Sequence, residues 1–408
     1  MFKALVIFCA ALGFTLDVLR EWLDARWQRT PIPESVRDVY DAQEYARWQR
    51  YSREKKRLSL LGSAVSTAVL IAVFATDALA WVCELLPQGE YPQALLLFVV
   101  WMLFSSLIEI PFHYIDQMKI EEKYGFNRST MATFVLDEIK GFIISTGLFC
   151  ALLAVSIACW HTMGGAFFLA VYAALALFML VFSTCSLTFM KLFNKFTPLE
   201  EGSLRERLET MFAQNGYRLK NIYVMNASKR TAKANAFCAG LGKFKEIALY
   251  DTMIESFTED EIVAVFAHEL THFKHSDTRV LTVLNVLRFL PAMLLIWLLA
   301  TQPALLAQMG FDRLNFGMVF IVLFSALLSP VMTVMQLPFC AISCRMERRA
   351  DAYPASIGLG EAMVSALKKT ARLNFSNLNP HPLNVKLFYS HPPIAERIRR
   401  IQEAEKAK

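Results

Sequence analysis

Charged residues are scarce in this chain: 19% of its 408 residues are Asp, Glu, Lys or Arg, whereas 55% are hydrophobic. An ordinary soluble domain has about a quarter charged residues and just under half apolar ones. The composition therefore argues against a soluble enzyme, and the hydrophobicity also excludes an intrinsically disordered chain. Internal repeats, low-complexity tracts and basic stripes interleaved with aromatics are missing too, and the net charge is only +6. We therefore expect no nucleic-acid partner.

Cysteine pairs are also missing. The chain has eight cysteines, but none forms a Cys-x-x-Cys motif and most lie within hydrophobic runs. This spacing does not indicate a disulfide framework. Small buried thiols are the better interpretation, because unpaired cysteine behaves as a small hydrophobic residue.

Long hydrophobic runs, by contrast, are abundant. A bilayer core requires about 20 apolar residues in one helix, and we expect seven such spans: Phe2–Leu19, Leu58–Cys83, Gln93–Phe112, Gly141–Trp160, Ala166–Phe189, Val280–Ala300 and Phe316–Cys340. The first run is the weakest. A signal peptide would be followed by a small-residue cleavage site and a soluble chain, whereas six further runs follow here, so we interpret it as a span.

Lysine and arginine alternate between the connections. The nearly bare connections are 84–91, 161–165 and 301–315, and the basic ones are 20–57, 119–140, 191–279 and 345–408. Because basic loops stay in the cytosol, the pattern predicts an N-terminus outside and a C-terminus in the cytosol.

A few ionisable residues fall within the spans or at their ends: Asp17, Asp77, Glu109, Asp116 and Arg288. Such residues usually face a bundle interior or a water-filled cavity. Local pairing or snorkelling near a helix end is the alternative, and the sequence does not decide between the two.

These patterns predict a predominantly α fold, with a seven-helix membrane bundle and a cytosolic domain that contains a small β-sheet. Strands are expected at 218–227 and 246–250, with an edge strand at 233–237 followed by a turn at Gly240 and Gly242. The expected division is a bundle with spans one to five (1–190), a first cytosolic part (191–279), spans six and seven (280–340) and a second cytosolic part (341–408).

A helix with a chemical motif lies in the first cytosolic part. Thr258 and Glu261 form a capping box that opens it, and His268-Glu269-Leu270-Thr271-His272 follows. Residues at i and i+4 share one helix face, so both imidazoles can reach one metal ion. Glu269 is offset by one residue and would reach the attacking water, as in zinc metalloproteases.

The third metal ligand has to come from elsewhere. His275 shares the helix face, but the helical rise places it about 10 Å from His268, so we interpret it as a near-surface or outer residue. Glu347 and Asp351 follow the last span and are four residues apart. One carboxylate could bind the metal, and the other could accept the free N–H of a ligand histidine.

The chain at this point resembles a known family. An HExxH motif followed by a distant ExxxD is typical of gluzincin metallopeptidases, and the match is close to their membrane-integrated branch, the type I CAAX prenyl endopeptidases. The stretches that carry this resemblance are Glu121–Asn127, Ser228–Arg230, Asn235–Ala236, Leu249–Thr252 and Ser390–Pro393, together with Arg397. The seven spans and the order of the elements agree, so the resemblance covers almost the whole chain.

The resemblance implies a role for each matching residue. His268, His272 and Glu347 would hold one zinc ion, Glu269 would be the general base, and Asp351 would orient a ligand histidine. Asn235 and Ala236 would lie on an edge strand that pairs with the substrate backbone, and His391 and Arg397 would face the oxyanion. The chain departs from the family pattern at two positions: Thr271 replaces a frequent glycine, and Phe237 replaces an aromatic that is often tyrosine.

The implied function is that of an integral membrane zinc metalloendopeptidase that removes the C-terminal tripeptide of prenylated proteins or peptides, acting from spans that enclose a hollow chamber. No motif in the sequence indicates recognition of a prenyl group, so a bacterial membrane protease for general processing or quality control is the alternative. We favour a bacterial inner membrane over the endoplasmic reticulum. A transporter is disfavoured because internal repeats are missing, and a pseudoprotease because His268, Glu269 and His272 are intact.

Overall fold

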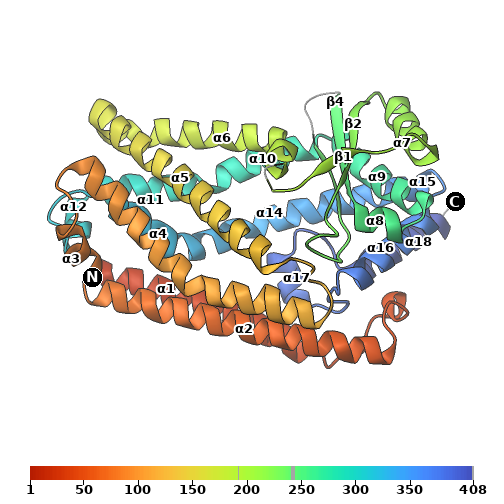
Figure 1. Cartoon of the computed structure of the whole chain (residues 1–408), viewed down its shortest axis with the longest axis horizontal. Coiled ribbons are helices and arrows are strands. Elements are labelled where there is room, and N and C mark those ends of the chain that lie inside the picture. Colours follow the sequence, from red (N-terminus) through yellow and green to blue (C-terminus); the bar gives the residue numbers. More distant parts are fainter. Residues whose placement is uncertain (192, 240–243, 407–408) are drawn as a thin grey trace.

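The computed structural model describes residues 1–191, 193–239 and 244–406, and it is elongated, with long helices along its main axis (Figure 1). The N- and C-termini lie at opposite ends of this axis. The long helices and their continuations are α1 Phe2–Trp27, α2 Ala42–Ala75, α4 Glu90–Ile115, η2 Asp116–Glu121, α5 Met131–Met163, α6 Phe167–Met190, α10 Asp277–Arg288, α11 Leu290–Thr301, α13 Phe316–Val322, η4 Leu323–Leu327 and α14 Leu328–Ala350.

Each of the seven predicted spans falls on these helices. By length and hydropathy, 6 segments of the described chain could cross a membrane. One of them, Met131–Ser183, runs through both α5 and α6, which are separate helices joined through Gly164 at φ 53°. The multi-pass α-helical bundle is confirmed, and the count of seven is approximate because it depends on whether α5 and α6 are counted separately.

Two expected spans are interrupted. The run 58–83 does not stay helical, because α2 ends at Ala75 and Asp77 adopts a left-handed backbone (φ 55°) before α3 (Ala78–Glu84). Asp77 pairs there with Lys3 of α1 at 2.6 Å. The run 280–300 divides into α10 and α11 around Phe289, because Pro291 removes a backbone donor and its ring clashes with the preceding turn.

The intramembrane ionisable residues behave in two ways. Asp17 and Glu109 border one cavity of about 350 Å³ between α1, α2, α4 and η4. The others have local partners: Asp77 pairs with Lys3, Asp116 pairs with Lys55 at 2.7 Å, and Arg288 donates to Gln336 at 2.6 Å. Both interpretations that the sequence left open therefore occur, at different positions.

The sheet has four strands in the order β1-β2-β4-β3. Their bounds are β1 Phe196–Pro198, β2 Arg218–Met225, β3 Ala236–Ala239 and β4 Phe244–Tyr250. The two predicted strands at 218–227 and 246–250 are β2 and β4, which pair in parallel. β3 pairs antiparallel with β4 and lies at the edge. The predicted turn at Gly240 and Gly242 lies outside the described residues.

Alternation along β4 places the sheet between the membrane helices and the helix that carries the HExxH motif. Ile247 and Leu249 pack with Phe266 in one core, whereas Ala248, between them, faces Leu187 of α6. Successive side chains of a strand point to opposite faces, so one face of the sheet rests against the end of α6 and the other supports α9.

Helices complete the end of the molecule that carries the sheet (Figure 1). Their bounds are α7 Ser203–Gln214, α8 Asp251–Ser256, α9 Glu259–Lys274, α15 Ala352–Ser356, α16 Gly360–Leu373, α17 Pro382–Phe388 and α18 Ile394–Lys406, and the remaining short turns are η1 Glu34–Val36, η3 Gly164–Ala166 and α12 Pro303–Ala307. A second core joins α2 to this end, since Trp48 and Tyr51 are buried with Phe375 and Ile398. The connection between α1 and α2, the start of α2 and the C-terminal helices thus share one core.

The first prediction concerns the start of α9. Thr258 caps this helix, and both hydrogen bonds of the capping box are formed. The Thr258→Ala variant should lose about 1 kcal/mol of stability, which would appear as a lower midpoint of thermal unfolding in detergent. Thr258→Ser keeps the hydroxyl and is the matched control. Equal stability of the Ala and Ser variants would contradict the prediction.

Candidate active site

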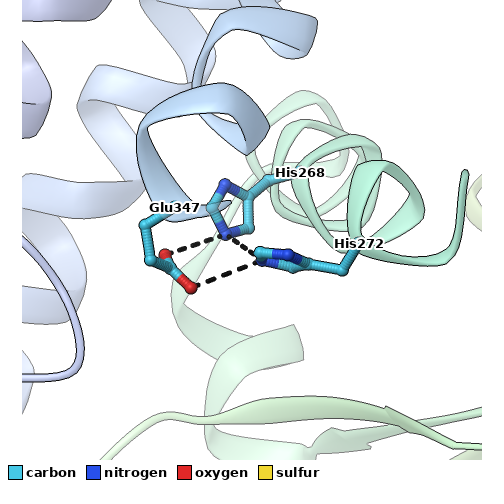
Figure 2. A group of neighbouring side chains, drawn as sticks. All are labelled: His268, His272 and Glu347. Carbon is cyan, nitrogen blue, oxygen red and sulfur yellow. Dashed lines mark hydrogen bonds and ion pairs between the residues drawn. The ribbon is translucent and has the colours of Figure 1, made fainter. Parts of the chain in front are cut away.

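The HExxH motif lies on a helix that is buried on most sides. Its apolar residues pack against the sheet and against α16, so the helix is fixed in position. His268 and His272 project from one side of α9, one turn apart, as Figure 2 shows. Thr271, between them, is also buried, and its hydroxyl donates to the carbonyl of Ala267 at 3.2 Å. A hydroxyl therefore fits at this position inside the helix packing.

Glu347 approaches the two histidines from the C-terminal end of α14 (Figure 2). His268 Nε2 lies 3.2 Å from His272 Nε2 and 3.3 Å from Glu347 Oε2, and His272 Nε2 lies 3.4 Å from Glu347 Oε1. Ligand atoms at about 2.0–2.1 Å from one tetrahedral Zn²⁺ are roughly 3.3 Å apart. The three side chains thus have the separations that a single bound ion requires.

The burial of Glu347 also fits a metal. Its side chain is 7% exposed, and Oε2 is a buried oxygen without a hydrogen-bond partner among the described residues. A buried carboxylate is costly unless positive charge compensates it, and here the nearest such groups are His268 Nε2 at 3.3 Å and Arg397 Nη2 at 3.7 Å. Within the described chain, one group of side chains has its possible ligand atoms close enough together to hold a single ion: His268, His272 and Glu347. The residues therefore fit a divalent metal.

Asp351 lies beside His268 rather than beside the shared ligand position. Its Oδ1 is 3.1 Å from His268 Nδ1, the ring nitrogen that faces away from Glu347. Arg397 of α18 holds the same carboxylate through two atoms, with Nε at 2.9 Å and Nη2 at 2.7 Å. The two carboxylates thus occupy different positions: Glu347 faces both histidines, and Asp351 contacts His268 alone of the two.

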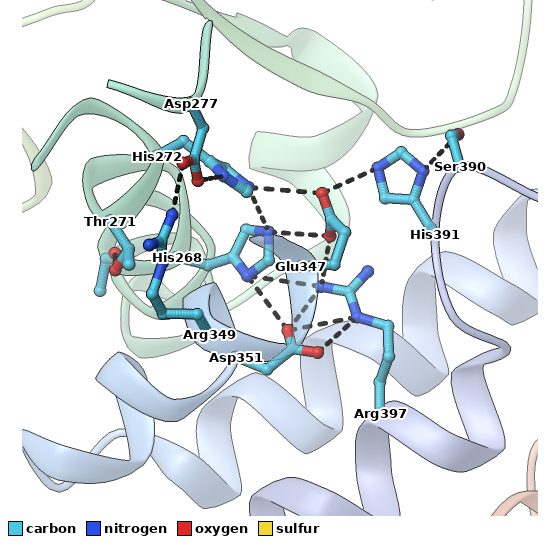
Figure 3. Close-up of polar contacts among 11 residues, drawn as sticks. His268, Thr271, His272, Asp277, Glu347, Arg349, Asp351, Ser390, His391 and Arg397 are labelled. Carbon is cyan, nitrogen blue, oxygen red and sulfur yellow. Dashed lines mark hydrogen bonds and ion pairs between the residues drawn. The ribbon is translucent and has the colours of Figure 1, made fainter. Parts of the chain in front are cut away.

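His272 has a similar carboxylate partner that the sequence analysis missed. Its Nδ1 lies 2.9 Å from Asp277 Oδ2, and Asp277 is 1% exposed and also pairs with Arg349. Ser276 turns the chain through a left-handed backbone (φ 57°) and so directs Asp277 back toward the histidine. Figure 3 shows Asp351 below His268 and Asp277 beside His272. An acidic residue five positions after the motif was the available sequence signal.

The remaining predicted residues surround this group. His391 lies on its open side, with an exposed ring whose Nε2 is 3.2 Å from Glu347 Oε1 and whose Nδ1 contacts Ser390 at 2.9 Å (Figure 3). Glu269 is half-buried, and its negative charge raises the pKa of His272 and Arg397, although other groups contribute more. His275 is exposed at the end of α9 and is not part of the group.

The predicted substrate strand is at the sheet edge. Ala236 opens β3, and Asn235 precedes it with an exposed side chain whose Oδ1 accepts from the Ala236 N–H at 2.9 Å. One side of β3 is bonded to β4, and the described sheet has no strand on its other side. Phe237 makes an edge contact with the ring of Tyr250, so an aromatic without a hydroxyl is accommodated there.

Electrostatics favour a positively charged His268 when no metal is bound. Burial lowers the pKa of this imidazole, but the Asp351 and Glu347 carboxylates outweigh burial and raise the pKa to about 9. The pKa of His272 is also raised, because Glu347 and Asp277 outweigh its burial. A metal ion that binds here therefore has to displace a proton from His268, whose protonated form the Asp351 and Glu347 carboxylates stabilise.

Comparisons with known proteins agree with this architecture. Residues 22–195 match the family model described as the CAAX prenyl protease N-terminal region with five membrane helices, and residues 198–405 match peptidase family M48. The chain is similar to the CAAX prenyl protease 1 homolog of Oryza sativa subsp. japonica, with 29% identity over 96% of both chains. It is 30% identical to the probable CAAX prenyl protease 1 of Schizosaccharomyces pombe, over 91% of this chain and 82% of that protein.

The similarity extends to a solved structure. The crystal structure of S. mikatae Ste24p superposes with a TM-score of 0.90 and 25% identity, over 98% of this chain and 99% of that chain. The membrane bundle and the end that carries the sheet and α9 are therefore arranged as in that protein.

The second prediction concerns Asp277. Replacing it with alanine removes the acceptor that orients His272, and the affinity for metal should fall by about 10- to 100-fold. The measurement is competition of the purified protein against a chelator of known affinity. His275→Ala is the control and should leave the affinity unchanged, because His275 lies outside the ligand group. Loss of metal from the His275 variant would show that the assignment of ligands is wrong.

The third prediction concerns pH. Because the pKa of His268 is raised to about 9, this imidazole is protonated below that pH, and a metal ion must displace the proton. The apparent affinity for metal should therefore rise as the pH increases from 6 and level off near 9, by about tenfold per pH unit for each proton displaced. An affinity that is constant between pH 7 and 9 would contradict the expected proton release.

Proposed function

Because the chain belongs to peptidase family M48, we propose that it is a zinc-dependent membrane endopeptidase that removes the C-terminal tripeptide of prenylated proteins. The observation that supports this most directly is the buried group of His268, His272 and Glu347, at one end of a multi-pass bundle. The family establishes a metallopeptidase, and the relatives named as CAAX prenyl proteases cover almost the whole chain. The metal identity, the prenylated substrate and the orientation are parts of the proposal.

Zinc is the metal that the donor set favours. Two imidazole nitrogens and one carboxylate, with a further position left open, are typical of catalytic zinc sites. When bound, zinc would supply Lewis-acid activation of water and of the scissile carbonyl. Asp351 and Asp277 would hold the two imidazoles in the orientation and tautomer that a metal ligand requires.

The protein groups around the metal position have separate roles in proton transfer and in stabilising the developing charge. We propose that Glu269 takes a proton from the attacking water and later delivers it to the leaving amine. His391, on the open side of the site, would donate to the developing oxyanion. Arg397, fixed by Asp351 with Nη2 3.7 Å from Glu347, would add a stationary positive charge close to the reacting carbonyl.

The edge strand supplies a way to hold the substrate. A peptide that adds to β3 would be bound through its backbone near Asn235 and Ala236, so varied side chains could be accepted. This mode suits an endopeptidase whose substrates share a modified C-terminal motif but differ in sequence.

Orientation follows from the charge pattern of the connections. The basic segments coincide with the end of the molecule that carries the sheet, α9 and the C-terminal helices, which supports a cytosolic active site and an external N-terminus. Whether the membrane is a bacterial inner membrane or that of the endoplasmic reticulum stays a prediction from the sequence alone.

The fourth prediction tests the activity and its substrate together. Purified protein in detergent should cleave a farnesylated CAAX peptide faster than its unprenylated twin. Glu269→Ala should lower kcat/KM by about 10²- to 10⁴-fold, the usual contribution of a general base, while the bound metal remains stoichiometric by elemental analysis. A chelated sample should be inactive and should regain activity with added Zn²⁺.

Each alternative outcome has a definite meaning. Equal cleavage of both peptides would keep the metalloprotease and exclude prenyl selectivity, which was the general-processing alternative. Cleavage of neither peptide by zinc-loaded protein would exclude these substrates. Full activity of the Glu269→Ala variant would exclude Glu269 as the general base.

A further inference from the structure

The segment that leads into the edge strand is attached to the membrane bundle by an ion network. Glu121, at the end of η2, accepts from Tyr51 at 2.5 Å and from Lys55 at 2.9 Å, both on α2. It also pairs with Lys233 at 3.0 Å, two residues before Asn235. One carboxylate of the bundle therefore connects two membrane helices to the start of the substrate edge.

This network is sheltered from solvent. The side chain of Glu121 is 12% exposed and that of Lys233 is 31% exposed. The Lys233 ammonium also lies 5.1 Å from the ring centre of Phe126, within the range of a cation–π contact. A partly buried, multiply bonded ion pair contributes more than a surface pair, because less water competes for either charge.

Backbone pairing strengthens the same connection. The Arg128 N–H donates to the Arg230 carbonyl at 3.0 Å, and the Ala232 N–H donates to the Phe126 carbonyl at 3.0 Å. The loop after η2 and the chain before β3 thus form a short antiparallel bridge, centred on Asn127 and Thr231. The Glu121–Asn127 motif, to which the catalytic proposal assigns no role, supplies both the carboxylate and this bridge.

The residues between the bridge and the edge strand are held one after another. The Thr252 hydroxyl donates to the Lys233 carbonyl at 2.8 Å. The amide of Asn374 contacts both backbone groups of Ala234, accepting from the N–H at 3.0 Å and donating to the carbonyl at 3.1 Å. The Asn235 carbonyl accepts from the Tyr250 N–H at 3.0 Å. The chain therefore enters β3 with its position fixed by partners on three elements.

A fixed position matters at a strand that binds by pairing. A displacement of one residue along the strand reverses which side chains face each side, and smaller displacements shift the bound peptide relative to the metal. Resting on the proposed function, we infer that Glu121 is a positioning residue. Through Lys233 it holds the segment 233–235 against the membrane bundle, and it thereby sets the place at which a substrate peptide pairs with β3.

The fifth prediction follows from this role. Glu121→Gln should raise KM for the prenylated peptide roughly tenfold, the scale of a lost hydrogen bond to a charged group. Because Glu121 contacts neither the metal ligands nor Glu269, kcat should stay within about twofold and the metal content should not change. Lys233→Met should have the same effect. In the Lys233→Met background, Glu121→Gln should raise KM much less than it does in the wild type, because both variants remove the Glu121–Lys233 pair.

The neighbouring Glu122 provides the matched control, since its side chain is exposed. Glu122→Gln should leave KM unchanged. Hydrogen–deuterium exchange gives a readout that does not depend on turnover: amides of 231–239 should exchange faster in the Glu121 and Lys233 variants, while those of 218–225 in β2 keep their protection. A general loss of structure would instead speed exchange in both segments.

Two results would overturn the inference. One is a fall in kcat or in metal content at constant KM, and the other is unchanged KM with unchanged exchange at 231–239. Failure of the proposed function looks different, since wild-type protein would then cleave neither peptide. In that case the inferred role in substrate binding is contradicted as well, and the exchange measurement still decides whether Glu121 holds the strand.

Discussion

Convergence of Glu347 on His268 and His272 is the constraint on which the rest of this structure depends. It brings a carboxylate and two imidazoles into a buried space, an arrangement that is costly unless positive charge, from a metal ion or from protonated His268, compensates the carboxylate. The cost is met by rigid placement: α9 is fixed between the sheet and α16, and α14 extends directly out of a membrane span. The bundle is therefore the scaffold of the site as well as an anchor.

The carboxylates of Asp351 and Asp277 connect α9, which carries the two histidines, to α14, which carries Glu347. Asp351 follows Glu347 by one helical turn and contacts His268, so one stretch of chain at the end of α14 places carboxylates on both sides of this histidine. Asp277 begins α10 and orients His272, while Arg349 of α14 pairs with Asp277. Each helix thus fixes groups on the other, and a shift of either one would disturb both histidines.

Much of the chemistry was readable from the sequence because it is local. The capping box at Thr258, the i,i+4 histidines and the existence of the strands β2 and β4 depend on neighbours along the chain, and the structure contains each of them. The membrane character was equally clear, because a span is specified by the composition of one continuous run. The expected span 58–83 is interrupted at Asp77. There the backbone is left-handed, and the side chain pairs with Lys3, a residue distant in sequence.

By itself the sequence determined a multi-pass α-helical protein with an HExxH helix. Residue chemistry left the third metal ligand open between Glu347 and Asp351, and the resemblance pointed to Glu347. Only the tertiary structure showed that Asp277 is the partner of His272 and that Glu121 of the bundle connects to Lys233, just before the edge strand β3. The physical reason is that these are contacts between elements far apart along the chain or across a turn. Their geometry depends on how helices pack and on where single residues redirect the backbone, and no local periodicity encodes it.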